Sequence, residues 1–388
     1  MEDIYVRLEE VTTLIMGQAP NSSDCNFRGE GTPFIKAGEF GTKYPIIREW
    51  TTNPLKLAKK EDILICVVGA TAGKLNLGID AAIGRSVAAI RCNDNKLNNL
   101  YLYYFLHTWL VKLRDRSQGS AIGVITKEML NDIGILLPSL NIQNKIVDIL
   151  NKVQELIDKR KAQVKALDEL VKSKFIEMFG DPSKNTMGWM VDKLSTVVIN
   201  IENGKSFVCE NFSRSDEYPA ILKLSSVTYG IYNSNENKAL TDDDLFVSNV
   251  EVKNGDLLFT RKNTPELVGM SAFVYYTEPN LMMPDLIFRL NTNDKINKIY
   301  LWKLINHSLF RENIKSLSNG SAKSMSNISK KRLMELNIPI PPIQLQNQFA
   351  CFVNKVDKLK FEMQLSLKEL ESNFNSLMQK AFNGELFN

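Results

Sequence analysis

Two long stretches of the chain place apolar side chains at every third or fourth position, with Arg160 as the one polar interruption. The first runs from Ile146 to Met178 and the second from Phe349 to Ala381. The spacing averages about 3.5 residues, the period of a coiled coil, and it predicts two amphipathic helices. At a rise of 1.5 Å per residue, about 35 residues make each helix ~50 Å long.

Helices with matched apolar stripes bury them best against each other, and antiparallel packing suits a chain with an internal repeat. The alternative is two surface helices, each docked on its own globular module. We predict the paired arrangement. The residues expected at its seam are Ile146, Ile149, Val153, Ile157, Val164, Leu167, Val171, Phe349, Phe352, Val356, Leu359, Met363, Leu367, Leu370 and Phe374.

The segment before each stripe is also repeated. Ile135–Ile146 reappears as Ile338–Phe349, about 203 residues further along the chain. Ahead of it, each half has the same predicted order of short strands, then a helix, a Gly-Ser break and a last apolar run. The strands are expected at Asp62–Val68 and Val87–Arg91, and at Asp256–Thr260 and Leu286–Leu290; the helices are expected at Tyr101–Arg116 and Tyr300–Lys315.

These patterns predict an α+β protein with an internal pseudo-two-fold repeat. Two mixed α/β modules are each followed by a long helix, and the two helices form an antiparallel coiled coil. The predicted segments are a first module at 1–140, a first helix at 141–180, a second module at 181–342 and a second helix at 343–388. Because the framework repeats while the loops differ, the two modules are expected to recognise different things.

Composition places the chain among ordinary globular proteins. It has 388 residues, 44% hydrophobic and 24% charged, with a formal net charge of +4. This mild basic excess is compatible with DNA but does not establish it. The five cysteines show no Cys-x-x-Cys spacing, and Met1 is not followed by a basic segment and an apolar core. We therefore expect a reduced, cytoplasmic protein without a structural metal or a membrane segment.

Catalytic motifs are missing from the chain. A methyltransferase that modifies DNA amino groups needs a Gly-rich cofactor loop and an Asn/Asp-Pro-Pro-aromatic motif. Asp181-Pro182 is followed by Ser183 instead. Gly69–Lys74 is one residue short of a phosphate-binding loop and has no Ser or Thr after the lysine. The expectation is a protein without catalytic residues or a cofactor.

Taken in order, these segments resemble the DNA-specificity subunit of type I restriction-modification systems, over essentially the whole chain. The resemblance rests on the strand-and-glycine segment Asp62–Ala70 with its echo Asp256–Thr260, and on the Gly-Ser loops Gly119–Thr126 and Gly320–Ser329. The most recognisable part is the helix entry. It has Pro138, Leu140, Gln143 and Ile146 in the first copy, Pro342, Gln346 and Phe349 in the second, and Phe175–Pro182 leading to the second module.

This resemblance implies two target-recognition domains, each contacting one half of a bipartite, asymmetric double-stranded DNA sequence. The helices would set the spacer between the halves and bind two methyltransferase subunits, and two restriction subunits would complete the complex. S-adenosylmethionine, ATP and magnesium would then be bound only by partner subunits.

Phosphate contacts should come from loop cations, and sequence selectivity from side chains that reach base edges. Lys36 and Lys223 recur between the copies, as do Lys127 and Lys330. For each candidate the alternative is a solvated surface charge or, for the serines, a cap of the following turn. The complete set of candidates is Lys36, Lys43, Arg48, Lys74, Arg85, Ser120, Lys127, Lys223, Arg261, Lys262, Ser321, Lys323 and Lys330.

Two other functions remain open at this point. One is a recognition subunit of a modification-only or phage-defence system, whose partner lacks a nuclease. The other is a coiled-coil scaffold that binds proteins and has no DNA role. The sequence does not specify the half-sites, the spacer or the loop residues that touch bases.

Overall fold

The computed structural model describes the whole chain except residues 1–3, 94–95, 118–122, 319–324 and 387–388. It consists of two compact units. Unit 1 contains Met1–Ala162 and Gln364–Asn388, and unit 2 contains Gln163–Met363. Each unit therefore includes part of both long helices, which the predicted division into four consecutive segments did not foresee. The boundaries of those segments stay a prediction.

Unit 1 is built on a four-stranded antiparallel sheet. Its order is β2-β10-β7-β8, with β2 Thr12–Met16, β10 Val87–Cys92, β7 Ile63–Cys66 and β8 Leu75–Leu77. Strand β1 Ile4–Arg7 pairs with β11 Gly134–Leu137. A second sheet, called the smaller sheet because most of its five strands are very short, has the order β3 Cys25–Asn26, β5 Trp50–Thr51, β4 Thr32–Ile35, β9 Ala81–Ile83 and β6 Leu57–Ala58. The short helices are α1 Leu8–Val11, η1 Ser22–Asp24, η2 Ala37–Glu39 and α3 Lys127–Asn131, and the long one is α2 Asn99–Ser117.

The position of strand β7 between two apolar clusters explains why its sequence is a continuous apolar run rather than an alternating one. Ile63 and Ile65 pack in the cluster that contains α2, whereas Leu64 and Cys66 pack in a second cluster with the smaller sheet. All four side chains are fully buried. The strand thus lies between two layers, and both of its faces must be apolar.

Unit 2 repeats this plan. Its main sheet has the order β13-β20-β16-β18, with β13 Val198–Asn203, β20 Ile287–Thr292, β16 Leu257–Thr260 and β18 Ser271–Phe273. The other strands are β12 Met190–Lys193 paired with β22 Asn337–Ile340, β17 Lys262–Asn263 paired with β21 Ser326–Asn327, and the sheet β15 Asn237–Ala239, β14 Ala220–Leu222 and β19 Leu281–Met282. The helices are η3 Leu194–Thr196, α5 Ser225–Thr228, η4 Asp243–Leu245, η5 Ser248–Val250, α6 Lys298–Asn306, α7 Arg311–Lys315 and α8 Lys330–Met334.

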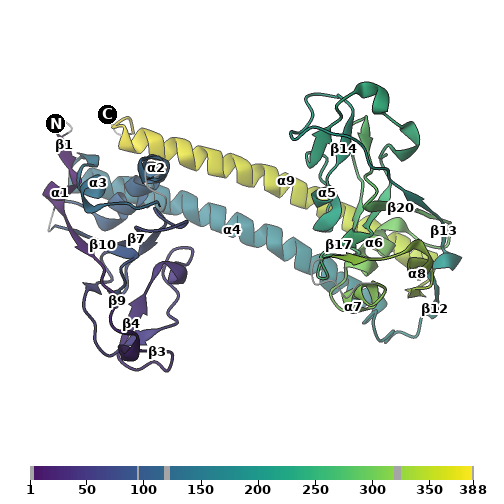
Figure 1. The fold of residues 1–388 in the computed structure, drawn as a ribbon, viewed down its shortest axis with the longest axis horizontal. Coiled ribbons are helices and arrows are strands. Elements are labelled where there is room, and N and C mark those ends of the chain that lie inside the picture. Colours follow the sequence, from purple (N-terminus) through teal and green to yellow (C-terminus); the bar gives the residue numbers. More distant parts are fainter. Residues whose placement is uncertain (1–3, 94–95, 118–122, 319–324, 387–388) are drawn as a thin grey trace. The chain divides into compact units, whose positions relative to one another are not determined.

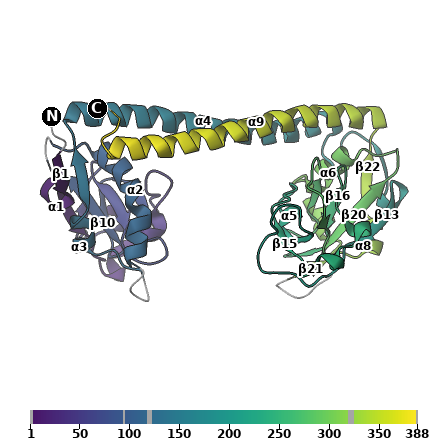
Figure 2. The ribbon, with the colours of Figure 1, turned by 90° about the horizontal axis from the view of Figure 1, so that it is seen from above.

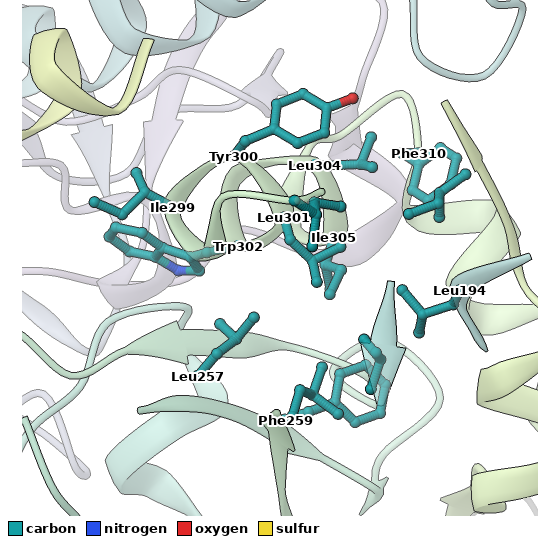
Figure 3. Packing of buried hydrophobic residues seen from close by; sticks show 14 of the residues in the cluster. Leu194, Leu257, Phe259, Ile299, Tyr300, Leu301, Trp302, Leu304, Ile305 and Phe310 are labelled. Carbon is teal, nitrogen blue, oxygen red and sulfur yellow. The ribbon is translucent and has the colours of Figure 1, made fainter. Parts of the chain in front are cut away.

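The core of unit 2 lies between α6 and the main sheet. Figure 3 shows Leu301 and Ile305 of α6 above Leu257 and Phe259 of β16. Phe259 is fully buried and stacks parallel to Phe288 of β20, with ring centroids 6.5 Å apart. This core therefore fixes the end of β16, where the chain continues into β17.

The predicted helix at Tyr300–Lys315 is wrong in one respect, because two helices occupy that segment. Helix α6 ends at Asn306, and His307 has an extended backbone with φ −65° and ψ 127°. Phe310 is almost fully buried, and its backbone N–H donates to His307 O at 2.8 Å. The turn at 307–310 seats Phe310 in the core, which a continuous helix would not allow.

The two long helices are α4 Leu140–Phe179 and α9 Ile343–Phe382, and each has 40 residues. Each helix is longer than the stretch of about 35 residues predicted from the apolar period. The difference lies at the start, because α4 begins before Ile146 and α9 begins before Phe349. Helix α9 ends before the predicted limit of 388. In unit 1, Lys161 of α4 pairs with Glu371 of α9 at 2.8 Å; in unit 2, Asp168 of α4 pairs with Lys360 of α9. Since the residue number rises along α4 while that of its partner falls, the helices are antiparallel (Figures 1 and 2).

The apolar stripes also complete the cores of the units. The two arrangements considered from the sequence, helices paired with each other and helices docked on the modules, are therefore both partly realised. In unit 1, Phe382 contacts Tyr101 with ring centroids 5.1 Å apart. In unit 2, Phe175 of α4 contacts Tyr300 of α6, with ring centroids 5.7 Å apart. Of the predicted seam, the structure buries Ile146, Ile157, Val171, Phe349 and Val356 and half-buries Ile149, Val153, Val164, Leu167, Phe352, Met363, Leu367, Leu370 and Phe374.

Leu359 departs from that pattern, because its side chain is 43% exposed. It lies three residues after Val356 and therefore on nearly the same side of α9, but no part of the module that the structure describes covers it there. Exposed apolar side chains occur elsewhere on both helices, at Leu156, Leu170, Ile176, Phe361 and Leu365. Among the helices of the described segments, none is both long and apolar enough to cross a bilayer.

Candidate nucleic-acid interface

Matching backbone hydrogen bonds show which positions of the two units correspond. Gly17 N donates to Val87 O, and Gly204 N donates to Ile287 O in the same way. At the end of the central strand, Ile125 N donates to Val67 O and Ile328 N donates to Arg261 O, both at 2.8 Å. The framework is therefore the same in both units, and side chains at equivalent positions can be compared directly.

A buried ion pair is repeated within this framework, and the sequence analysis missed it. In unit 1, Arg91 binds both carboxylate oxygens of Asp62 at 2.8 Å. In unit 2, Arg289 donates from Nε to Asp256 at 2.9 Å and also pairs with Glu202 at 2.7 Å. The hydrogen bond to Asp62 raises the pKa of Arg91, and burial raises the pKa of Asp256. These arginines brace the sheet and are not available for DNA.

The glutamine of the helix entry has a structural role. Gln143 is fully buried, accepts from Asn98 N at 2.8 Å and donates to Pro138 O at 2.8 Å. Gln346 makes the equivalent bonds with Asn297 N and Pro341 O. Each glutamine thus joins the start of a long helix to the loop before the module's helix. The motif could be read from the sequence, but its role required the partners.

Two of the unit 1 candidates are engaged within the protein. Lys36 forms an ion pair with Glu49, and that hydrogen bond raises the pKa of the lysine. Lys74 donates from Nζ to Phe40 O at 2.7 Å and is half-buried. Both side chains hold the smaller sheet in place, so they are weaker candidates for phosphate contact than an unengaged cation.

The other unit 1 candidates are exposed on loops or helix ends. None of them forms an ion pair with any residue that the structure describes. Lys127 is the first residue of α3, whose N-cap Thr126 accepts from Met129 N at 3.2 Å. These four cations are Lys43, Arg48, Arg85 and Lys127.

In unit 2, Lys223 is 3.9 Å from Glu236 and is partly neutralised. Arg261, Lys262 and Lys330 gather at the tip of the sheet, where β17 and α8 begin. Arg261 Cζ lies 5.4 Å and Lys330 Nζ 5.8 Å from the ring centroid of Phe288. Three candidates, Ser120, Ser321 and Lys323, lie outside the described residues.

Equivalent positions at the tip differ in chemistry. Where unit 2 has Arg261 and Lys262, unit 1 has Val67 and Val68. The loop that exposes Arg85 in unit 1 exposes Asp285 in unit 2, because Val87 N and Ile287 N close the same turn. The equivalent of Lys74 is Met270. The units thus share a backbone and present different charges at its end.

Burial changes the pKa of two of the five cysteines strongly and also affects both histidines. Burial raises the pKa of Cys66 to about 11 and of Cys92 to about 12, so both thiols stay protonated near neutral pH. Burial lowers the pKa of His107 and of His307. Within the described ranges, the one carboxylate cluster close enough for a shared metal ion is the exposed run Asp242, Asp243 and Asp244.

A family model described as the type I restriction modification DNA specificity domain matches residues 3–166 and 187–371. The MjaX specificity subunit of Methanocaldococcus jannaschii is 36% identical over 166 residues, which are 42% of this chain and 39% of that protein. The MjaVIII specificity subunit of the same organism is 23% identical over 351 residues, 86% of this chain and 81% of that protein.

The fold is also found in a solved structure. The S subunit of a type I restriction-modification system from M. genitalium superposes with a TM-score of 0.59 over 98% of this chain and 96% of that chain. The two sequences are 15% identical. The likeness therefore concerns the arrangement of the backbone, including the repeated modules and the paired helices.

Proposed function

Since the chain belongs to the type I restriction-modification DNA specificity family, we propose that it is the subunit that selects the DNA sequence and that it performs no chemistry itself. Each unit contacts one half of a bipartite, asymmetric target. Methyl transfer, with S-adenosylmethionine, and ATP- and magnesium-dependent cleavage belong to partner subunits. The raised pKa of the Cys66 and Cys92 thiols, which keeps both protonated near neutral pH, is compatible with this division.

One observation carries the proposal of two different half-sites. The same turn exposes Arg85 in unit 1 and Asp285 in unit 2. An arginine favours the guanine acceptors, whereas a carboxylate accepts from the cytosine amino group. Two surfaces of such different chemistry on one framework suit an asymmetric target.

The paired helices are proposed to set the spacer. Helices α4 and α9 are each continuous over 40 residues, or ~60 Å at 1.5 Å per residue. That length corresponds to about 18 base pairs of B-DNA at 3.4 Å per pair, so the uncontacted spacer is expected to be shorter.

The outer faces of the helices are proposed to bind two methyltransferase subunits, and two restriction subunits then join the complex. Support comes from the exposed apolar side chains of both helices, such as Leu156 at 52% and Phe361 at 60% exposure. Apolar surface of this kind on a polar helix is typical of a protein interface.

Methylome sequencing tests the proposal. A host that carries this chain with its modification subunit should show methylation at two different half-sites separated by a constant spacer. The modification subunit alone should produce no such pattern. Methylation at a single contiguous site, or at half-sites with a variable spacer, would contradict the bipartite model.

The same strain separates the other two functions. A modification-only system would methylate the bipartite site but would not restrict unmodified phage DNA. A protein scaffold would leave the methylome unchanged whether or not this chain is present.

A further inference from the structure

Two cations of unit 2 share one buried aromatic ring. Arg261 follows β16, and Lys330 is the first residue of α8. Their charged groups lie 5.4 and 5.8 Å from the ring centroid of Phe288, whose side chain is 1% exposed. The ring thus forms an apolar floor that holds the stems of both side chains, while each residue remains partly exposed.

The positive charge of this cluster is not balanced within the protein. Among the described residues, no carboxylate lies within ion-pair distance of Arg261, Lys262 or Lys330, whereas Arg289 of the same sheet pairs with two. The buried Nε atom of Arg261 has no hydrogen-bond acceptor among the described residues. Lys330 uses one of its three donors on Ile201 O and keeps two free. Neighbouring like charges without a counter-ion favour a bound anion.

Unit 1 lacks this cluster although its backbone is the same. The position of Arg261 is occupied by Val67, and that of Phe288 by Ala88. Lys127 corresponds to Lys330, since each follows the N-cap of the equivalent short helix. Among the described residues no aromatic ring or second cation lies beside Lys127, which is an exposed lysine. The anion site is therefore a property of unit 2.

We propose that Arg261 and Lys330 hold a phosphodiester group of the DNA backbone over the Phe288 ring, and that unit 2 therefore supplies more of the salt-dependent affinity than unit 1. The inference rests on the proposed function, because it assigns the DNA group that this cluster binds. An arginine fork and a lysine ammonium match the oxygens of a phosphate. A phosphate contact adds affinity without adding sequence selectivity.

The test measures DNA binding by the complex of this chain with its modification subunit. Duplexes carry the target found by methylome sequencing, and sodium chloride is varied from about 50 to 200 mM. Arg261→Met and Lys330→Met keep an unbranched side chain over the ring but remove the charge. Each should lower the affinity about tenfold, and the double variant should reduce the slope of log K against log salt by about 1. The methylated sequence should not change.

Lys127→Met is the matched control in unit 1 and should change the affinity less than Lys330→Met does. Arg261→Lys keeps the charge and should retain most of the slope, which also covers the case that a neutral variant fails to fold. An unchanged slope in the double variant overturns the proposal. So does a changed base in the second half-site, because the cluster would then contact base edges. If the unaltered complex shows no specific binding, the proposed function itself fails.

Discussion

Gln143 and Gln346 are single side chains that hold the modules to the long helices. Gln346 is fully buried and satisfies three backbone groups, Asn297 N, Lys295 O and Pro341 O. A buried N–H or C=O without a partner costs about 1–3 kcal/mol. The glutamine therefore stabilises a junction that apolar packing alone would leave with unpaired polar groups.

Replacing Gln346 with alanine should lower the free energy of unfolding by about 3 kcal/mol, because it leaves these backbone groups buried without partners. Urea denaturation followed by circular dichroism measures the change. Gln348→Ala is the control, since Gln348 lies on the exposed side of the same helix turn. Equal, small effects of both substitutions would show that water replaces the amide at no cost.

Helices α6 and α9 meet through a half-buried lysine. Lys303 of α6 lies over the Trp302 ring, 3.5 Å from its centroid, with Asp357 of α9 at 4.0 Å. Tyr275, which follows β18, donates to Asp357 at 3.0 Å and to Asn354 at 2.9 Å. Burial lowers the pKa of Lys303 to about 8, and the Asp357 charge offsets only part of that effect.

This shift predicts how stability depends on pH. The unfolded chain protonates Lys303 up to about pH 10.5, whereas the folded chain releases that proton above about pH 8. Between these values the unfolded state binds more protons, so the free energy of unfolding contributed by Lys303 rises with pH. From pH 7.5 to 9.5 the gain should be on the order of 1 kcal/mol.

Lys303→Met isolates this contribution, because methionine fills similar space and does not titrate. The difference in unfolding free energy between the two proteins, measured by guanidinium denaturation, should shift with pH in favour of the unaltered chain. A difference that stays constant from pH 7.5 to 9.5 would show that Lys303 keeps its proton throughout this range.

The continuity of α4 and α9 governs the molecule as a whole. Each helix contributes to the core of both units, through Ile146 and Phe175 for α4 and through Phe349 and Phe382 for α9. Neither unit is complete without residues from both helices. Under the proposed function, a change in helix length should therefore alter the DNA target without altering how each unit folds.

Inserting seven residues after Ala162 in α4 and seven after Met363 in α9 preserves the apolar period of both helices. Each insertion adds ~10 Å at 1.5 Å per residue. The methylome should show the same half-sites with a spacer about three base pairs longer. Seven residues inserted in the exposed loop at Asn53 should leave the spacer as it was, and an unchanged spacer in the helix variant would rule out the ruler role.

The predicted elements differ in how well the sequence indicated them. The strands at β7 and β16 and the helices α2, α4 and α9 followed from apolar runs and periods. The break at His307 did not, because its cause is the distant pocket that takes Phe310. For the candidate cations, the sequence showed their spacing but not their partners. Glu49 neutralises Lys36 from 13 residues away, and no local pattern indicates such a pair.

The sequence by itself determined that the chain is duplicated, that each copy ends in a long amphipathic helix, and that the two copies differ in their loops. These features depend on local periodicity and on repetition, which are visible in one dimension. Only the tertiary structure decided which cations are engaged and which are free, and that Arg261 and Lys330 meet over Phe288. Such contacts join residues far apart in the chain, and the packing of the core sets them.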